Sequence, residues 1–203
     1  SGSLPKSVIE KYPHPCPEAF IMAAEYHIGL LNKFDFNDIA ISLKSSSVPL
    51  TVAAYRAFHK KYSYPLHVGV TEAGCEYDGI IKSAAGIGAL LIDGIGDTIR
   101  ISLTDNPAKE IKAGKSLLKA LGLLKGYPEI VSCPTCGRTK VDIIKIANEI
   151  TDRVSDIKKE ETTEEQKEEK PVKEKAEGKK ISLPGLWTSL LLLTFIISTC
   201  CGL

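Results

Sequence analysis

Two cysteines separated by two residues occur in the stretch Cys133-Pro-Thr-Cys-Gly-Arg138, directly after a short apolar run. This spacing lets both sulfurs bind one zinc ion or one iron–sulfur cluster, or form a redox-active disulfide. A single pair is half of a tetrahedral zinc site, and a cluster needs at least one more ligand. The remaining cysteines lie in distant segments at spacings that favour none of these chemistries: Cys16, Cys75, Cys200 and Cys201. The residues alone leave iron–sulfur, zinc and dithiol chemistry open.

A second group of polar residues falls at the ends of predicted strands. Its members are Lys44, Thr71, Glu72, Arg100 and Ser102. Ligands of parallel βα proteins bind at the carboxyl ends of the strands, so we expect these side chains to lie together. A lysine, an arginine and several hydroxyls favour an anion, most naturally a phosphate. Each residue taken singly is more often an ordinary strand or loop residue, and their shared position carries the prediction.

The alternation of residues within the predicted strands sharpens this site. Arg100 lies between Ile99 and Ile101, so its side chain should face the opposite side of a buried strand, where it needs an anionic partner or ligand. His67 has the same placement in its strand, although a lone histidine there is more often a hydrogen-bonded core residue than a ligand. Glu72 could act as an acid, a base or an ion-pair partner of a nearby cation.

The elements that must position these residues alternate between strands and helices. Helices are predicted at residues 15–33, about 49–61, 79–92, 107–121 and 139–153, and strands at 38–43, 65–71, 98–103 and 129–133. This alternation indicates βαβ units and a parallel sheet. Three or four units are too few to close an eight-stranded barrel.

Composition limits the function classes. The net charge of +1 shows no basic excess, which argues against nucleic-acid binding. Scattered cysteines without an amino-terminal signal segment predict a reducing compartment, and hence the cytoplasm.

The last part of the chain has a different composition. Residues 158–180 consist mostly of Lys and Glu, which predicts a disordered charged linker. Residues 181–203 are apolar and uncharged, long enough for a possible membrane segment that begins on the cytoplasmic side. An exposed apolar tail or a frameshifted end is the alternative interpretation.

Several stretches, in order from residue 1 to about 155, resemble one family, 4-hydroxy-3-methylbut-2-en-1-yl diphosphate synthase. They are Ser1-Gly-Ser-Leu4, Asp38-Ile-Ala-Ile-Ser-Leu-Lys44, Leu66-His-Val-Gly-Val-Thr-Glu-Ala-Gly74, Gly94-Ile-Gly-Asp-Thr-Ile-Arg-Ile-Ser-Leu103 and Cys133-Pro-Thr-Cys-Gly-Arg138. Residues 156–203 match nothing in that family.

The resemblance implies an α/β fold in which the chain is a fragment that begins after the fifth strand of a TIM barrel. Residues 1–126 would hold the last three βα units of the barrel, and residues 127–157 the start of an α+β iron–sulfur domain. The charged linker at 158–180 and the apolar tail at 181–203 would follow.

The resemblance also implies an activity. The family reductively converts 2-C-methyl-D-erythritol 2,4-cyclodiphosphate to 4-hydroxy-3-methylbut-2-enyl diphosphate in the methylerythritol phosphate pathway of isoprenoid (terpenoid) biosynthesis. It takes electrons from ferredoxin or flavodoxin, carries a [4Fe–4S] cluster and acts as a homodimer.

The family's functional residues have counterparts in this chain. Lys44, Arg100 and Ser102 match positions that bind the diphosphate of the substrate, and His67 matches a site histidine. Glu72 matches a glutamate near the reacting carbon. Two of the three cluster cysteines match Cys133 and Cys136.

One departure from the family changes the expectation for this chain. The third cluster cysteine belongs to a Cys-Val-x-Asn-Gly-Pro-Gly-Glu stretch that the sequence lacks. We therefore expect the chain to be inactive by itself. Two alternatives remain open: a membrane-tethered binding or scaffold protein, and a small zinc-binding module built on the cysteine pair.

Overall fold

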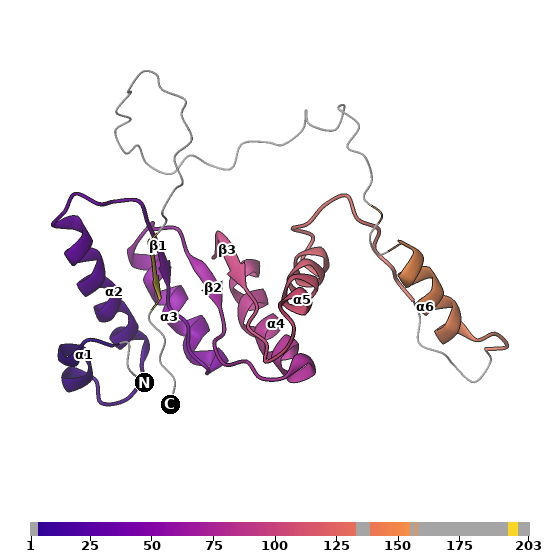
Figure 1. Cartoon of the computed structure of the whole chain (residues 1–203), viewed down its shortest axis with the longest axis horizontal. Helices are drawn as coiled ribbons and strands as arrows, with labels where there is room; N and C mark the ends of the chain where they lie inside the picture. Colours follow the sequence, from indigo (N-terminus) through magenta and orange to yellow (C-terminus); the bar gives the residue numbers. More distant parts are fainter. Residues whose placement is uncertain (1–3, 133–138, 155–156, 158–194, 199–203) are drawn as a thin grey trace, which may run out of the picture. The chain divides into compact units, whose positions relative to one another are not determined.

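The computed structural model describes residues 4–132, 139–154, 157 and 195–198 of the chain. These residues belong to two compact units, Ser1–Leu124 with Leu193–Leu203, and Lys125–Leu192. The elements follow in the order α1 (Lys6–Lys11), α2 (Pro17–Asn32), β1 (Ile39–Ser42), α3 (Val48–Lys61), β2 (His67–Gly69), α4 (Glu76–Ile92), β3 (Thr98–Arg100), α5 (Pro107–Ala120), α6 (Ile143–Val154) and β4 (Phe195–Ser198) (Figure 1).

The strands of the first unit are parallel, as the sequence predicts. β2 pairs with β3 in the register His67↔Thr98, Val68↔Ile99 and Gly69↔Arg100. β1 pairs with the residue before β2, through a parallel bridge between Ile41 and Leu66. The helices α3 and α4 form the connections β1–α3–β2 and β2–α4–β3, because parallel neighbours need a crossover. The predicted βαβ units are therefore confirmed.

Side-chain caps and prolines mark the start of two helices that follow strands, α3 and α5. The Ser47 hydroxyl caps α3 by accepting a hydrogen bond from the amide of Leu50 at 3.4 Å. The Asn106 side chain caps α5 by accepting one from the amide of Ala108 at 2.9 Å. Each helix has a proline in its first turn, where a missing N–H costs nothing. These local signals fix where the chain leaves the sheet.

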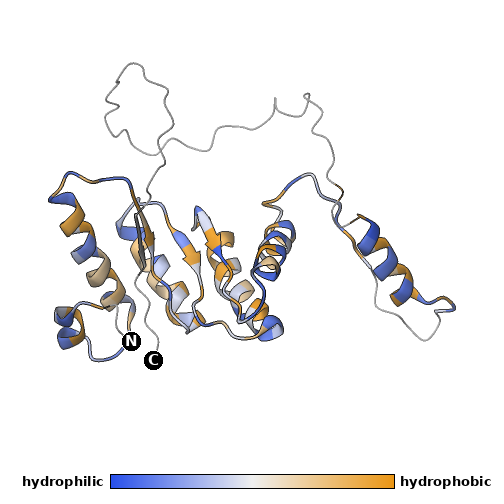
Figure 2. Cartoon of the chain, viewed as in Figure 1, coloured by the Kyte–Doolittle hydropathy of each residue, from blue (hydrophilic) through white to orange (hydrophobic). Residues whose placement is uncertain are grey.

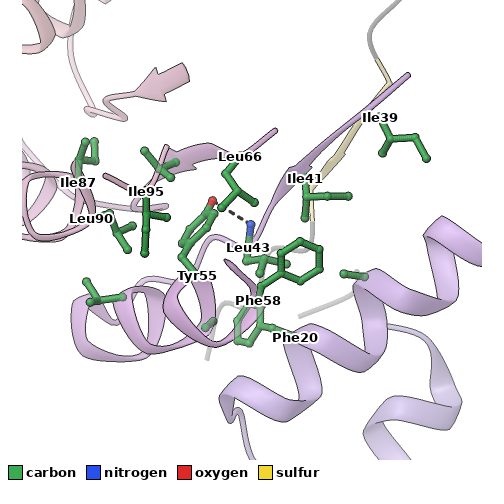
Figure 3. Close-up of a cluster of buried hydrophobic side chains, with 14 of the residues drawn as sticks. Phe20, Ile39, Ile41, Leu43, Tyr55, Phe58, Leu66, Ile87, Leu90 and Ile95 are labelled. Atoms are coloured by element: carbon green, nitrogen blue, oxygen red, sulfur yellow. Dashed lines mark hydrogen bonds between the residues drawn. The ribbon is translucent and has the colours of Figure 1, made fainter. Parts of the chain in front are cut away.

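The core lies between β1, β2 and the helices α2, α3 and α4. Phe20, Ile41, Tyr55, Phe58 and Leu90 are fully buried there, and Figure 3 shows their side chains converging from four elements. Burying a large apolar side chain contributes about 1.5–3 kcal/mol relative to leaving it exposed. The packing of this core therefore holds the strands and helices together.

The structure departs from the predicted elements around residues 129–132. The expected strand is wrong for these residues, which adopt no regular structure. A strand needs a neighbour for its backbone groups, and no described residue pairs with this segment. Val131 is accordingly 87% exposed. The helix α1, by contrast, is present although the sequence did not indicate it.

The helix α6 confirms the predicted helix at 139–153. None of its residues is buried, although apolar and polar residues alternate around it (Figure 2). Ile144, Ile146 and Ile150 all expose substantial surface. In the described part of the chain, α6 thus presents an amphipathic surface without a packing partner.

Part of the predicted apolar tail forms the strand β4. It runs parallel to β1 in the register Ile39↔Phe195 to Ser42↔Ser198. The predicted charged linker at 158–180 and the rest of the tail lie outside the described residues. Among the helices that the structure describes, none is long and apolar enough to cross a membrane.

Candidate functional site

The strand register gathers the predicted basic residues on one face. Gly69 pairs with Arg100, and His67 pairs with Thr98, so these four residues share a face of the β2–β3 pair. The bridge between Ile41 and Leu66 places Lys44 level with Gly69 in the same register. Sequence order alone put these residues at strand ends, and the register brings them together.

Gly69 makes room for the lysine. A Cβ atom at this position would lie 3.3 Å from Cδ of Lys44 and 2.7 Å from the carbonyl oxygen of Arg100. The aliphatic stem of Lys44 therefore crosses β2 at Gly69, and only 4% of the residue is exposed. A buried cation is costly unless anions or dipoles offset its charge. The lysine therefore lies beside Arg100 and His67 on the face that the strand register defines.

The pKa of His67 reflects its proximity to Lys44 and Arg100. Partial burial lowers the pKa of His67, and the positive charges of Lys44 and Arg100 lower this pKa further. Its Nδ1 atom lies 2.8 Å from Oγ1 of Thr98, close enough for a hydrogen bond. The imidazole is therefore held neutral beside two cations. An anion bound among the three groups would offset the positive charge and raise this pKa.

Arg100 differs from the prediction in its burial. Its placement opposite Ile99 and Ile101 is correct, because these two side chains face Gly114 on α5. Arg100 itself is exposed rather than buried. The reason is that β3 has a strand neighbour only on its β2 side within the described chain. Its guanidinium is therefore accessible to a ligand.

Glu72 lies in the loop between β2 and α4 and has an unusual backbone conformation. Its φ angle is +51°, in the left-handed region that non-glycine residues rarely adopt. Backbone hydrogen bonds hold the loop before and after Glu72. The Thr71 amide donates to the Ser45 carbonyl at 3.2 Å, and the Thr104 amide donates to the Gly74 carbonyl at 2.9 Å. Strain of this kind concentrates at functional sites. Glu72 is exposed, and none of the ion pairs among the described residues includes it.

Ser102 lies two residues beyond Arg100 and is half-buried. Continuing the β2–β3 register places it level with Thr71, at the carboxyl ends of the strands. Both hydroxyl residues are therefore one step further along the face that carries Lys44, His67 and Arg100.

The predicted cluster ligands Cys133 and Cys136 lie outside the described residues. Among the residues that the structure describes, no group of three or more His, Cys, Asp or Glu side chains could hold a metal ion. Cys16 and Cys75 precede α2 and α4 as free thiols, so they occupy separate parts of the first unit.

Sequence reasoning missed two residues that shape the site. Gly69 is one of sixteen glycines, and no local signal separates it from the others. Tyr55 follows the apolar spacing of α3 with Val52 and Phe58, so it reads as a core residue. Its hydroxyl nevertheless bonds to the backbone of Leu43, directly after β1, and of His67 in β2.

The fold and this site define an α/β protein with a parallel sheet and a basic site at the carboxyl ends of its strands. Two family models match the chain, the GcpE TIM-barrel domain over residues 1–115 and the GcpE protein C-terminal domain over residues 129–164. The chain belongs to the GcpE family, and the resemblance seen in the sequence is confirmed. The expectation that residues 156–203 match nothing in that family is wrong for residues 156–164, because the C-terminal domain model extends through them.

Curated relatives carry the name 4-hydroxy-3-methylbut-2-en-1-yl diphosphate synthase (flavodoxin). The protein of Fusobacterium nucleatum is 57% identical over 150 residues, which are 74% of this chain and 42% of that protein. The protein of Ruminiclostridium cellulolyticum is 60% identical over 150 residues, with the same coverage. That of Caldanaerobacter subterraneus is 55% identical over 159 residues, 78% of this chain and 45% of the relative. The chain spans less than half the length of these relatives.

Proposed function

We propose that this chain forms the diphosphate-binding part of a reductive synthase. Its reaction would convert 2-C-methyl-D-erythritol 2,4-cyclodiphosphate to 4-hydroxy-3-methylbut-2-enyl diphosphate in isoprenoid biosynthesis. The observation that carries the proposal is the convergence of Lys44, His67 and Arg100 on one strand face, with the lysine stem laid across Gly69. The names of the relatives support the reaction.

The charges of the site suit a diphosphate. Lys44 and Arg100 would pair with its oxygens, and Arg100 can offer two parallel N–H groups to one phosphate. The hydroxyl of Ser102 and one N–H of the neutral His67 would donate further hydrogen bonds. Because the lysine is almost fully buried, most of the desolvation that binding requires has already occurred in the folded chain.

Glu72 would act near the reacting carbon. It lies in the loop between β2 and α4, at the strand ends where the substrate would lie, and the hydrogen bonds of this loop hold its backbone in the left-handed region. A fixed, exposed carboxylate at this position can hold or transfer a proton at its carboxyl oxygens.

Cys133 and Cys136 would be two of the three thiolate ligands of a [4Fe–4S] cluster. When bound, this group would pass the electrons of the reduction from the donor to the substrate. Two thiolates do not complete such a site, because a cluster of this kind needs at least one more ligand. We propose flavodoxin as the electron donor, because the relatives' names carry it.

We propose that β1, β2 and β3 are the last three strands of a (βα)8 barrel within residues 1–126. The iron–sulfur domain would begin within residues 127–157, consistent with the C-terminal domain match at 129–164. The complete enzyme would be a cytoplasmic homodimer. The charged linker at 158–180 and the possible membrane segment at 181–203 stay predictions.

The anion site can be tested on the full chain by titration with pyrophosphate. We expect the pKa of His67, followed by NMR, to rise on binding, because the anion offsets the charges of Lys44 and Arg100. His14, His27 and His59 serve as internal references in the same spectra. Replacing a charge-assisted contact typically weakens binding about 10- to 100-fold, which we expect for Lys44→Gln.

Lys61→Gln is the matched control, because Lys61 pairs with Glu25 at 2.5 Å rather than with the site. Its affinity for pyrophosphate should equal that of the wild type. An unchanged His67 pKa, or an equal loss of affinity in both lysine variants, would contradict the proposed site.

A further inference from the structure

The hydroxyl of Tyr55 lies between the backbones of β1 and β2. It accepts a hydrogen bond from the amide of Leu43 at 2.9 Å and donates one to the carbonyl oxygen of His67 at 2.6 Å. Figure 3 shows the hydroxyl of Tyr55, within the core, pointing toward the Leu43 amide. The tyrosine is fully buried, so its ring is fixed by packing and its hydroxyl cannot turn to water.

This hydroxyl takes the place of one direct backbone hydrogen bond, or rung, between the two parallel strands. The Ile41 amide donates directly to the Pro65 carbonyl at 2.8 Å, and Ile41 lies opposite Leu66. The next rung of a regular parallel pair would join the Leu43 amide to the His67 carbonyl. Here both groups bond to Tyr55 instead. Two successive hydrogen bonds span more than the roughly 2.9 Å of a direct rung, so the strands are held apart at this level.

The strands come together again beyond the gap. The Thr71 amide donates to the Ser45 carbonyl at 3.2 Å, in the same register as the Ile41 bridge. Two site residues lie where β1 and β2 are held apart. Lys44 directly follows Leu43, and the carbonyl that Tyr55 bonds belongs to His67. The Ser42 hydroxyl also donates to this carbonyl, at 2.9 Å.

We propose that Tyr55 is a positioning residue for the anion site. Its hydroxyl sets the spacing between β1 and β2, and this spacing lets the Lys44 stem cross β2 at Gly69 beside the His67 side chain. The inference rests on the proposed function, because it assumes that the cationic face binds a diphosphate. It assigns Tyr55 no contact with that ligand.

A purely structural tyrosine and a positioning tyrosine predict different results. Loss of a structural hydroxyl lowers stability and leaves the folded site intact. Loss of a positioning hydroxyl allows the direct rung to form, which moves Lys44 and His67 relative to each other. The second case changes both the affinity for an anion and the pKa of the free His67.

The test uses pyrophosphate binding to the full chain, measured by calorimetry, together with the His67 pKa from NMR. We expect Tyr55→Phe to bind pyrophosphate about tenfold more weakly, the loss that follows from misplacing one charge-assisted contact. The pKa of the free His67 should also differ from the wild type. Tyr62→Phe is the matched control: it removes a hydroxyl bonded to Glu25 at 2.5 Å, away from the site, and should keep wild-type affinity and His67 pKa.

A measurement on the wild type covers the case in which Tyr55→Phe does not fold. Coupling between two sites is reciprocal, so if the Tyr55 bridge favours the anion, pyrophosphate must stabilise the bridge. We expect saturating pyrophosphate to slow hydrogen exchange of the Leu43 amide about tenfold, with the Tyr62 amide, bonded to the Phe58 carbonyl, unchanged. An unaltered Leu43 exchange rate overturns the inference.

The outcomes separate the two proposals. If the wild type binds pyrophosphate and Tyr55→Phe matches it in affinity and in His67 pKa, the positioning role is wrong and the anion site stands. If the wild type does not bind pyrophosphate, the proposed function fails and the positioning role fails with it.

Discussion

Replacing Gly69 by alanine should disturb the strand pairing that builds the site. The added Cβ would lie 2.7 Å from the carbonyl oxygen of Arg100, closer than real Cβ contacts, and 3.3 Å from Cδ of Lys44. The lysine stem can move by a few tenths of an ångström. The carbonyl belongs to the backbone of β3, so it can move only if the β2–β3 register pairing Gly69 with Arg100 distorts.

The expected magnitude follows from two opposing effects. Overpacking of this kind costs about 1–3 kcal/mol. Alanine also restricts the unfolded chain more than glycine does, which stabilises the folded state by about 0.4–1 kcal/mol. We therefore expect Gly69→Ala to lower the free energy of unfolding by about 1–2 kcal/mol. With a urea m-value of about 1–3 kcal/mol/M, the midpoint should fall by roughly 0.5–1 M.

Urea denaturation followed by circular dichroism measures this change, and Gly29→Ala is the control. Gly29 lies on an exposed position of α2, and a Cβ there would meet no atom within 4 Å. Its replacement should raise stability by about 0.5–1 kcal/mol, because glycine weakens a helix interior. A Gly69→Ala chain as stable as the wild type, with unchanged affinity for pyrophosphate, would refute the close approach of Lys44, Gly69 and Arg100.

Three further predictions concern the core, a helix cap and pH. Phe58→Ala should lower the free energy of unfolding by about 3–5 kcal/mol in urea denaturation, because Phe58 is fully buried. Asn106→Ala should cost about 1 kcal/mol in the same assay, because the amide of Ala108 loses its cap. His67 favours the neutral form in the folded chain, since its pKa is lowered from 6.5; its stabilising contribution is therefore present above pH 6.5 and lost as the pH falls through the lowered value. In His67→Gln the urea midpoint should depend less on pH in that window, and an unchanged pH profile would count against the basic cluster.

Local patterns predicted most of the elements correctly. Apolar spacing and prolines located α2, α3 and α5 to within a few residues, because a helix is specified by contacts three and four residues apart. The predicted strand at 129–133 is wrong over its described residues, 129–132, for the opposite reason. Its residues have strand-like composition, but a strand also needs a neighbouring backbone, which the composition of one segment does not reveal.

The candidate site was predictable in its residue types and not in its geometry. Position at strand ends indicated Lys44 and Arg100 as ligands for an anion, and alternation indicated which side Arg100 faces. The exposure of Arg100 depends on whether another strand lies beside β3, which is a tertiary property. The prediction of a buried arginine was therefore wrong although its facing was right.

The sequence by itself determined the parallel α/β class, the family and the basic residues that could bind a diphosphate, because each is encoded in local periodicity or in motifs read along the chain. Only the tertiary structure decided that Gly69 makes room for Lys44. It also decided that the Tyr55 hydroxyl replaces a direct backbone hydrogen bond between Leu43 and His67. These contacts join residues 12 or more positions apart in sequence, and their distances depend on strand register and helix packing. No local pattern in α3 distinguishes a tyrosine that fills the core from one that also sets the spacing of two strands.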